Sequence, residues 1–315
     1  MQHQLRIVFM GTPDFAVGIL KCLIAHHYQI VGVVTVPDKP AGRGQKLQES
    51  AVKKYAISQN LNILQPNKLK SESFINDLKG LNANLQIVVA FRMLPKVVWQ
   101  LPALGTFNLH ASLLPQYRGA APINWVIING EKSTGVTTFF IEEKIDTGAI
   151  ILQKEINIEP DETAGTLHDK LMHLGSEVTL KTVQLIENNL VITQIQTPNN
   201  LKEAPKIFSE TCQINWDDTV ENIDNFIRGL SPYPTAWTIL HQNEEEIKVK
   251  IFKSKPEFEQ HTLKVGTIFS TPKSIKVAVK NGFILVEELQ LAGKKKMDTQ
   301  SLLNGFHFDT DASFS

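Results

Sequence analysis

LRIVFMGTPDFAV, residues 5–17, joins a mostly apolar run to a glycine, a threonine and a proline. An apolar run of this length is typical of a strand buried in a parallel sheet. Thr12 is positioned to cap the next helix, and Pro13 suits its first turn. The stretch therefore predicts a strand, a tight turn and a helix.

Further apolar strands are predicted downstream, at residues 30–36, 85–91, 106–114, 136–141 and 149–158. Helical or irregular stretches separate the first four strands, which predicts an α/β fold: a mainly parallel sheet with helices on both faces. Ligands of such sheets bind beyond the carboxyl ends of the strands. Residues 162–188 follow helical spacing, with Leu167, Leu171, Leu174 and Val178 on one stripe, and should close the first domain.

Residues 191–205 are polar and irregular, which is typical of a linker. A helix is predicted at 220–229, and short strands at 247–253, 265–269, 275–279 and 284–291. Short strands at this spacing favour a small β-barrel. We therefore expect a catalytic domain at 1–190, a linker at 191–205 and a barrel domain at 206–315.

Composition limits the classes of function. Lys and Arg number 32 and Asp and Glu number 32, so any polyanionic partner must bind a local patch. Cys22 and Cys212 lie far apart, which favours neither a disulfide framework nor a metal site. The sequence contains no apolar run long enough to span a bilayer and no zones of a signal peptide, so we expect a cytoplasmic protein without a membrane partner.

Asn108, His110 and Ser112 alternate with apolar residues, so in a strand they share one face. An amide can donate hydrogen bonds to a developing oxyanion, and an imidazole exchanges protons near neutral pH. The pattern is equally that of polar residues on a half-exposed strand. Asp146 follows the same logic: it could orient the imidazole, or it could simply form the turn before Gly148.

Two loops are considered as ligand-binding segments: the turn after the first strand and the loop at 37–46. The turn after the first strand lacks G-x-G-x-x-G, which argues against a nicotinamide cofactor. The loop at 37–46 contains glycines and the basic residues Lys39, Arg43 and Lys46. It suits either a mobile clamp on phosphates or an ordinary solvated loop.

The sequence resembles the methionyl-tRNA formyltransferases over nearly its whole length. The motifs that carry the resemblance are IVFMGTPDFAV at 7–17, PDKPAGRGQKL at 37–47, NLHASLLPQYRGAAPINW at 108–125 and IDTGAIIL at 145–152. Weaker similarity continues at 214–216, 230–237 and 291–297.

This resemblance implies formyl transfer from 10-formyltetrahydrofolate to the α-amine of methionyl-initiator-tRNA, in a Rossmann-like domain followed by an OB-like barrel. Asn108 and His110 would stabilise the tetrahedral oxyanion and Asp146 would act on His110. The folate would lie against residues 112–115 and 91–95. The cofactor-binding side chains would be Ser112, Leu113, Leu114, Pro115, Phe91, Arg92, Met93 and Leu94.

The resemblance also implies two contacts with tRNA. The loop with Lys39, Arg43 and Lys46 would hold the acceptor end, and the barrel would hold the other side. The barrel candidates are Lys248, Lys250, Lys253, Lys294, Lys295 and Lys296, although Lys294 to Lys296 equally fit a solvated turn. Between residues 206 and 296 there are 13 basic and 12 acidic residues, so RNA binding would require the basic ones to be segregated on one face.

Several alternatives stay open. Many members of the family that the sequence resembles have glycine where Arg92 stands, so Arg92 contacts the glutamyl tail of the folate or points to solvent, and we favour solvent. The acceptor amine could belong to a sugar nucleotide or to glycinamide ribonucleotide, or water could replace it and release formate. The chain could also be a tRNA-binding protein without catalysis. We expect a monomer.

Overall fold

The structure is a computed structural model that describes residues 4–41, 46–197 and 199–315. The chain divides into two compact units. The first consists of Met1–Gly119, Thr134–Ile156 and His168–Glu203, and the second consists of Ala120–Ser133, Asn157–Leu167 and Ala204–Ser315. Each unit therefore combines segments that are distant in the sequence.

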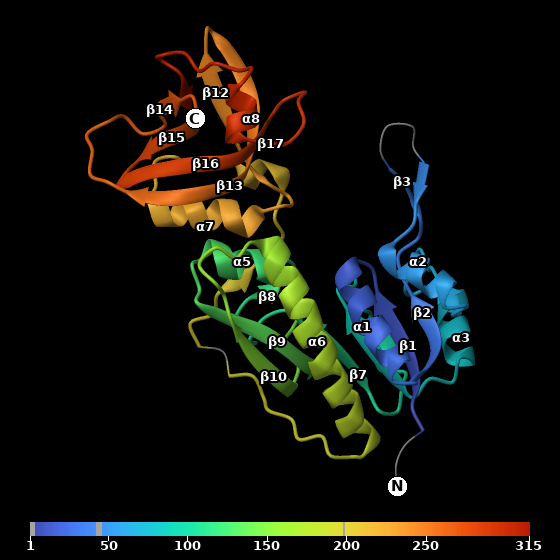
Figure 1. Ribbon diagram of the computed structural model, residues 1–315. Helices are drawn as coiled ribbons and strands as arrows, with labels where there is room; N and C mark the ends of the chain where they lie inside the picture. The colour runs from blue at the N-terminus through green and yellow to red at the C-terminus, as the bar shows by residue number, and fades with distance from the viewer. Residues whose placement is uncertain (1–3, 42–45, 198) are drawn as a thin grey trace. The chain divides into compact units, whose positions relative to one another are not determined.

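The first unit is built on a seven-stranded sheet of order β10-β9-β7-β6-β1-β2-β5 (Figure 1). Its strands are β1 (Arg6–Gly11), β2 (Gln29–Val34), β5 (Ile63–Leu64), β6 (Leu85–Val89), β7 (Thr106–His110), β9 (Ser133–Phe140) and β10 (Ile150–Asn157). Strands β5, β2, β1, β6 and β7 are parallel neighbours, whereas β9 runs antiparallel to β7. The prediction of a mainly parallel sheet is confirmed.

Helices cover both faces of this sheet. On one face, Val8, Met10 and Val88 pack with Phe74 and Leu78 of α3 (Glu72–Gly80). On the other face, α1 (Asp14–Ala25) and α6 (Ala164–Glu187) pack together. The predicted stripe of α6, Leu167, Leu171, Leu174 and Val178, is buried. The remaining helices of this unit are α2 (Ala51–Ser58) and the single-turn α4 (Lys96–Trp99).

The turn that follows β1 differs from the prediction in one detail. Pro13 occupies the N-cap position of α1 and no side chain caps the helix, so the prediction that Thr12 is the cap is wrong. The strand ends at Gly11, with two residues between it and the helix, and a Cβ atom at Gly11 would lie 2.6 Å from the Cβ of Ala16. Only glycine allows that close approach.

The basic loop is a hairpin at its base. Strand β3 (Lys39–Ala41) pairs antiparallel with β4 (Lys46–Gln48), and the tip between them lies outside the described residues. Lys53 forms ion pairs with Asp38 and with Glu49 beside this base. The loop predicted at 37–46 therefore includes β3 and the first residue of β4.

The second unit contains an antiparallel sheet of order β14-β15-β16-β13-β12-β18, with β17 paired to β16. Its elements are α5 (Pro122–Ile128), a 3-10 helix η1 (Ser209–Cys212), α7 (Val220–Leu230), β12 (Ala236–Gln242), β13 (Glu245–Phe258), β14 (Ile268–Thr271), β15 (Ser274–Val279), β16 (Gly282–Leu291), β17 (Met297–Asp298), α8 (Thr299–Leu303) and β18 (Ser313–Phe314). A bridge between Thr267 and Ser313 joins the two edges. The predicted β-barrel is confirmed, with α7 packed into its core.

Two short strands, β8 (Arg118–Gly119) and β11 (Glu203–Ala204), complete the described elements. No helix in the part of the chain that the structure describes is long and apolar enough to cross a bilayer.

Candidate active site

Strand β7 carries the first two candidate side chains at its carboxyl end. Asn108 pairs with Val88 of β6 and with Phe139 of β9, and its side chain is half-buried. Within the described residues, the Asn108 carboxamide has no hydrogen-bond partner, so its donors are available to a ligand. His110 is the last residue of the strand and is 6% exposed.

Ser112 lies beyond the end of β7, so the prediction that three alternating residues share one face of a strand is wrong for Ser112. Its hydroxyl is fully buried and donates to the carbonyl oxygen of Gln116 over 2.7 Å. The chain leaves the sheet at His110 because this loop forms its own hydrogen bonds in place of the sheet ladder.

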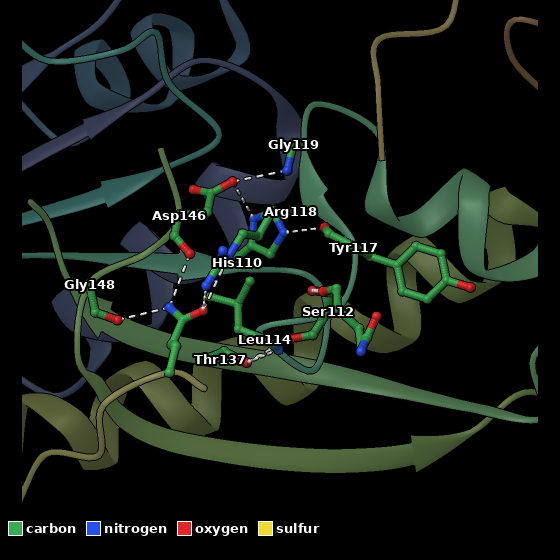
Figure 2. Close-up of polar contacts among 11 residues, drawn as sticks. His110, Ser112, Leu114, Tyr117, Arg118, Gly119, Thr137, Asp146 and Gly148 are labelled. Atoms are coloured by element: carbon green, nitrogen blue, oxygen red, sulfur yellow. Dashed lines mark hydrogen bonds and ion pairs between the residues drawn. The ribbon is translucent and has the colours of Figure 1, made fainter. Parts of the chain in front are cut away.

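Both nitrogens of the His110 ring face an oxygen atom (Figure 2). Nε2 lies 2.8 Å from the carbonyl oxygen of Tyr117, and Nδ1 lies 3.8 Å from Oδ2 of Asp146. A carbonyl oxygen only accepts, so Nε2 carries the proton and the neutral ring has its lone pair on Nδ1. The lone pair therefore points toward the Asp146 side.

Asp146 lies in the turn between β9 and β10 with a φ of 54°, which is left-handed backbone. Its Oδ2 accepts a hydrogen bond of 3.0 Å from the main-chain nitrogen of Gly119. Gly148 completes the turn, and a Cβ atom there would lie only 1.7 Å from the carbonyl oxygen of Phe140. The glycine of the IDTG motif is thus required by the close approach of the turn to β9.

The loop after β7 is held by buried hydrogen bonds. The amide of Leu114 donates to Thr137 Oγ1 over 3.1 Å, and Thr137 Oγ1 donates to the carbonyl oxygen of Ser112 over 2.7 Å. The Gln153 side chain donates to the carbonyl oxygen of Leu114 over 2.6 Å. Leu114 is buried, while Leu113 and Pro115 are half-buried. The folate contact of this loop stays a prediction.

The second predicted folate wall follows β6. Phe91 is half-buried, Met93 is 74% exposed and Leu94 is buried in the core of the unit. Exposed methionine next to a half-buried aromatic ring offers an apolar surface to a ligand. The assignment of these residues to the pterin stays a prediction.

The Arg92 side chain turns toward main-chain carbonyl groups of its own unit, and its contact with the folate stays a prediction. Its Nη1 donates to the carbonyl oxygen of Asn67 over 3.1 Å, and its Nη2 donates to that of Pro66. Its guanidinium carbon lies 5.5 Å from the ring centroid of Phe91. The preference for solvent is wrong, because two carbonyl groups and an aromatic ring contact the guanidinium, while its buried Nε has no hydrogen-bond partner within the described residues. Burial lowers the pKa of Arg92.

The basic residues of the hairpin are described in part. Lys39 is exposed at the start of β3, and the main chain of Lys46 begins β4. Arg43 lies outside the described residues. Their contact with tRNA stays a prediction.

The barrel lysines adjoin one another. Lys248 and Lys250 lie on the exposed side of β13, Lys250 pairs with Gln290 of β16, and Lys248 accepts a main-chain bond from Ala292. The Gln290 side chain in turn donates to the carbonyl oxygen of Lys294, in the turn that ends with Lys296. Lys248 Nζ lies 3.6 Å from the ring centroid of Trp237, while Lys253 and Lys296 pair with Glu287 and Glu288.

Comparison with known proteins decides the family. The sequence model described as formyl transferase matches residues 5–183, and that of the formyl transferase C-terminal domain matches residues 206–307. The methionyl-tRNA formyltransferase of Flavobacterium johnsoniae is 60% identical over 311 residues, which cover 98% of this chain and 99% of the relative. This chain belongs to the methionyl-tRNA formyltransferase family.

A second member of the methionyl-tRNA formyltransferase family, from Bacteroides thetaiotaomicron, is 55% identical over 311 residues, covering 97% of each chain. Among solved structures, the sugar 3N-formyl transferase WlaRD, determined in the presence of dTDP and 5-N-formyl-THF, has a TM-score of 0.65. Its sequence identity is 22%, with 93% of this chain and 100% of that chain covered. At that identity the similarity establishes the fold alone.

Sequence reasoning missed a residue that adjoins the site of this formyltransferase family member. Gln196 lies in the segment predicted as a linker, yet it is 7% exposed and bonded to the Asp146 turn. The residues around Gln196 are polar and show neither the hydrophobic periodicity of a helix nor that of a strand, so the sequence does not indicate that its side chain is buried. The main-chain groups of Tyr117 and Gly119, which face His110 and Asp146, likewise carry no side-chain signal in the sequence.

Proposed function

We propose that this protein transfers the formyl group of 10-formyltetrahydrofolate to the α-amino group of methionine on initiator tRNA, with Asn108, His110 and Asp146 as its catalytic residues. The observation that carries the proposal is the environment of His110. Its Nε2 is bound by the Tyr117 carbonyl and its Nδ1 faces the Asp146 carboxylate. This arrangement supports a role for Nδ1 as proton acceptor, two residues along β7 from a carboxamide that has no hydrogen-bond partner among the described residues.

The chemistry follows from these positions. The neutral methionine amine attacks the formyl carbon, and a C–N bond forms while the carbonyl oxygen gains the negative charge. The Asn108 carboxamide donates to that oxygen, as an oxyanion-hole donor does. The amine proton passes to His110 Nδ1, and the imidazolium so formed is stabilised by the Tyr117 carbonyl and by Asp146.

The second half of the reaction returns the proton. When the tetrahedral intermediate collapses, the bond between the formyl carbon and N10 of the folate breaks. The leaving nitrogen takes the proton from His110, so the products are formylmethionyl-tRNA and tetrahydrofolate. Asp146 acts on His110 and is placed to orient the attacking amine as well, since the 3.8 Å gap leaves no direct hydrogen bond between them.

The co-substrate would lie between the loop after β7 and the segment after β6. Leu113 and Pro115 are half-buried on one side, and Phe91 and the exposed Met93 lie on the other segment. Arg92 would support this wall through Phe91 and would not contact the glutamyl tail, because its guanidinium is already bound by main-chain carbonyls.

Two basic surfaces would hold the tRNA. One is the β3–β4 hairpin with Lys39, Arg43 and Lys46. The other is the barrel surface of β13, β16 and the following turn, with Lys248, Lys250, Lys294, Lys295 and Lys296. The adjacency of Lys250 and Lys294 through Gln290 supports a local segregation of basic charge, although Lys296 is paired with Glu288. We further propose that the protein acts as a monomer in the cytoplasm, where initiator tRNA is used.

The decisive experiment offers the protein labelled 10-formyltetrahydrofolate together with methionyl-tRNA, a nucleotide-linked amino sugar, or buffer alone. We expect label in methionyl-tRNA only. Transfer to the amino sugar alone would overturn the acceptor, and release of formate at the same rate without any amine would indicate a hydrolase. Binding of tRNA without folate binding would identify a non-catalytic RNA-binding protein.

A further inference from the structure

The side chain of Gln196 uses its full hydrogen-bonding capacity inside the first unit. Its Oε1 accepts from Nε of Arg118 over 3.2 Å and from Nη2 over 2.6 Å. Its Nε2 donates to the carbonyl oxygen of Asp146 over 3.0 Å and to that of Gly148 over 2.8 Å. Two acceptor sites and two donors are thus all occupied, and the side chain is 7% exposed.

The groups that Gln196 connects lie on opposite sides of His110. Arg118 stands between Tyr117, whose carbonyl faces His110 Nε2, and Gly119, whose main-chain nitrogen binds the Asp146 carboxylate. The Asp146 turn faces Nδ1 of the same ring. Gln196 therefore ties the segment on the Nε2 side to the turn on the Nδ1 side.

The turn needs such support because of its backbone. Asp146 adopts a φ of 54°, a conformation that costs free energy for a residue with a side chain. Both carbonyl groups that flank Thr147 are bonded by Gln196. Without the two hydrogen bonds from Gln196, the carbonyl oxygens of Asp146 and Gly148 would lose these partners, and fewer bonds would hold the turn in its conformation.

Main-chain hydrogen bonds fix the segment that carries Gln196. Two residues before it, the main chain of Gln194 exchanges two hydrogen bonds with Ile150, at 2.8 Å and 2.9 Å, at the start of β10. The side chain of Gln194 is exposed. The segment after α6 is therefore attached to the sheet edge at the point where it inserts Gln196 beneath the turn.

We propose that Gln196 is a positioning residue for formyl transfer, which sets the placement of the Asp146 carboxylate relative to the His110 ring. The inference rests on the proposed function of this site. It assigns a role to the segment predicted as a linker, residues 191–205, beyond that of a connection.

The test compares Gln196→Ala with Gln194→Ala, the same substitution at an exposed glutamine two residues away. Formyl transfer to methionyl-tRNA, KM for both substrates and the thermal midpoint are measured for each full-length variant. We expect Gln196→Ala to lower kcat by about 10- to 100-fold, the range found for residues that orient the ligands of metal sites, with KM changed little. Gln194→Ala should match the wild type.

A double-mutant cycle separates positioning from general destabilisation. In an Asp146→Ala background the carboxylate is gone, so Gln196→Ala should cost less than about threefold further, because coupled residues are not additive. Equal fold-losses in both backgrounds would overturn the proposal, and so would wild-type kcat in Gln196→Ala. If the alanine variant does not fold, Gln196→Glu is measured in its place. A glutamate side chain still accepts hydrogen bonds from Arg118 but cannot donate to the carbonyl groups of Asp146 and Gly148. A wild-type kcat in Gln196→Glu would also overturn the proposal.

The wild-type control keeps the two claims distinct. A wild-type protein that transfers no formyl group to methionyl-tRNA overturns the proposed function, and the role of Gln196 with it. An active wild type beside an equally active Gln196→Ala overturns only the role of Gln196.

Discussion

Nδ1 of His110 lies 3.8 Å from Oδ2 of Asp146, so the ring and the carboxylate face each other without a direct hydrogen bond. The carboxylate is held instead by the amide of Gly119 at 3.0 Å. Because Nε2 is bound by the Tyr117 carbonyl, any proton taken up by the ring arrives at Nδ1, in front of Asp146. This relationship supports the proposal that the two residues together receive the proton of an attacking amine.

Asn108→Ala should lower kcat by roughly 100- to 1000-fold, because loss of one oxyanion donor typically costs about 2.7–4 kcal/mol of transition-state stabilisation. The Asn108 side chain is half-buried, so the fold should persist. Steady-state formyl transfer measures the effect, with the exposed Asn188→Ala as the matched control. Turnover within threefold of wild type would remove Asn108 from the mechanism.

His110→Ala should lower turnover at least as severely, because it removes both the proton acceptor and the cation that follows. Single-turnover measurements with saturating methionyl-tRNA isolate this step from product release. We expect folate binding to persist in the variant. A His110→Ala enzyme with nearly unchanged single-turnover rate is incompatible with the mechanism.

Arg92→Ala should destabilise the first unit by about 1.5–3 kcal/mol, the range for hydrogen bonds to charged groups. The variant loses its bonds to the carbonyl groups of Pro66 and Asn67 and its contact with Phe91. Thermal unfolding measures the loss, and KM for the folate should rise because Phe91 is less well held. A variant with both values unchanged would show that this anchor is dispensable.

Lys250→Ala should weaken methionyl-tRNA binding and reduce the slope of log affinity against log salt by about one, if the ammonium group neutralises one phosphate. Lys250 is exposed on β13. The matched control is Lys181→Ala, an exposed lysine of α6 in the first unit. Equal salt slopes for wild type and Lys250→Ala would exclude this side chain from the interface.

The same measurement applies to Arg43→Ala, which should leave folate binding intact.

The buried carboxyl group of Asp224 should make the stability of the second unit depend on pH. It is 6% exposed and accepts from Ser254 over 2.8 Å and from Arg228 Nε over 3.1 Å. Burial, its largest influence, raises its pKa above the ordinary 3.8 despite these donors. A raised carboxyl pKa contributes stability that is complete below the unfolded pKa and is lost as pH rises through the folded pKa.

Hydrogen exchange of the α7 amides in the full-length protein checks this prediction. The opening free energy of wild type relative to Asp224→Asn should fall as pH rises from about 3.8, because asparagine cannot ionise. Parallel pH profiles for wild type and Asp224→Asn would contradict the raised pKa.

Sequence pattern alone was sufficient for the architecture. Apolar runs such as residues 5–10 and the period of α6 are local consequences of burial, so the parallel sheet, its covering helices and the later β-barrel were predictable. The pattern was least informative at the ends of elements. The pattern predicts that the strand includes Ser112, whereas it ends at His110. The hydrogen bond from the Ser112 hydroxyl to the Gln116 carbonyl holds the loop, and such a bond leaves no trace in the spacing of apolar residues.

The residue types of the site were also readable from the sequence, since an amide, an imidazole and a carboxylate near glycine turns are chemically distinctive. Their spacing was not. Tertiary structure decided that the Tyr117 carbonyl determines the protonated nitrogen of His110, that Arg92 is bound by the carbonyls of Pro66 and Asn67, and that Gln196 braces the Asp146 turn. Each of these contacts joins a side chain to main-chain groups that every residue possesses, so only the folded chain specifies which groups meet.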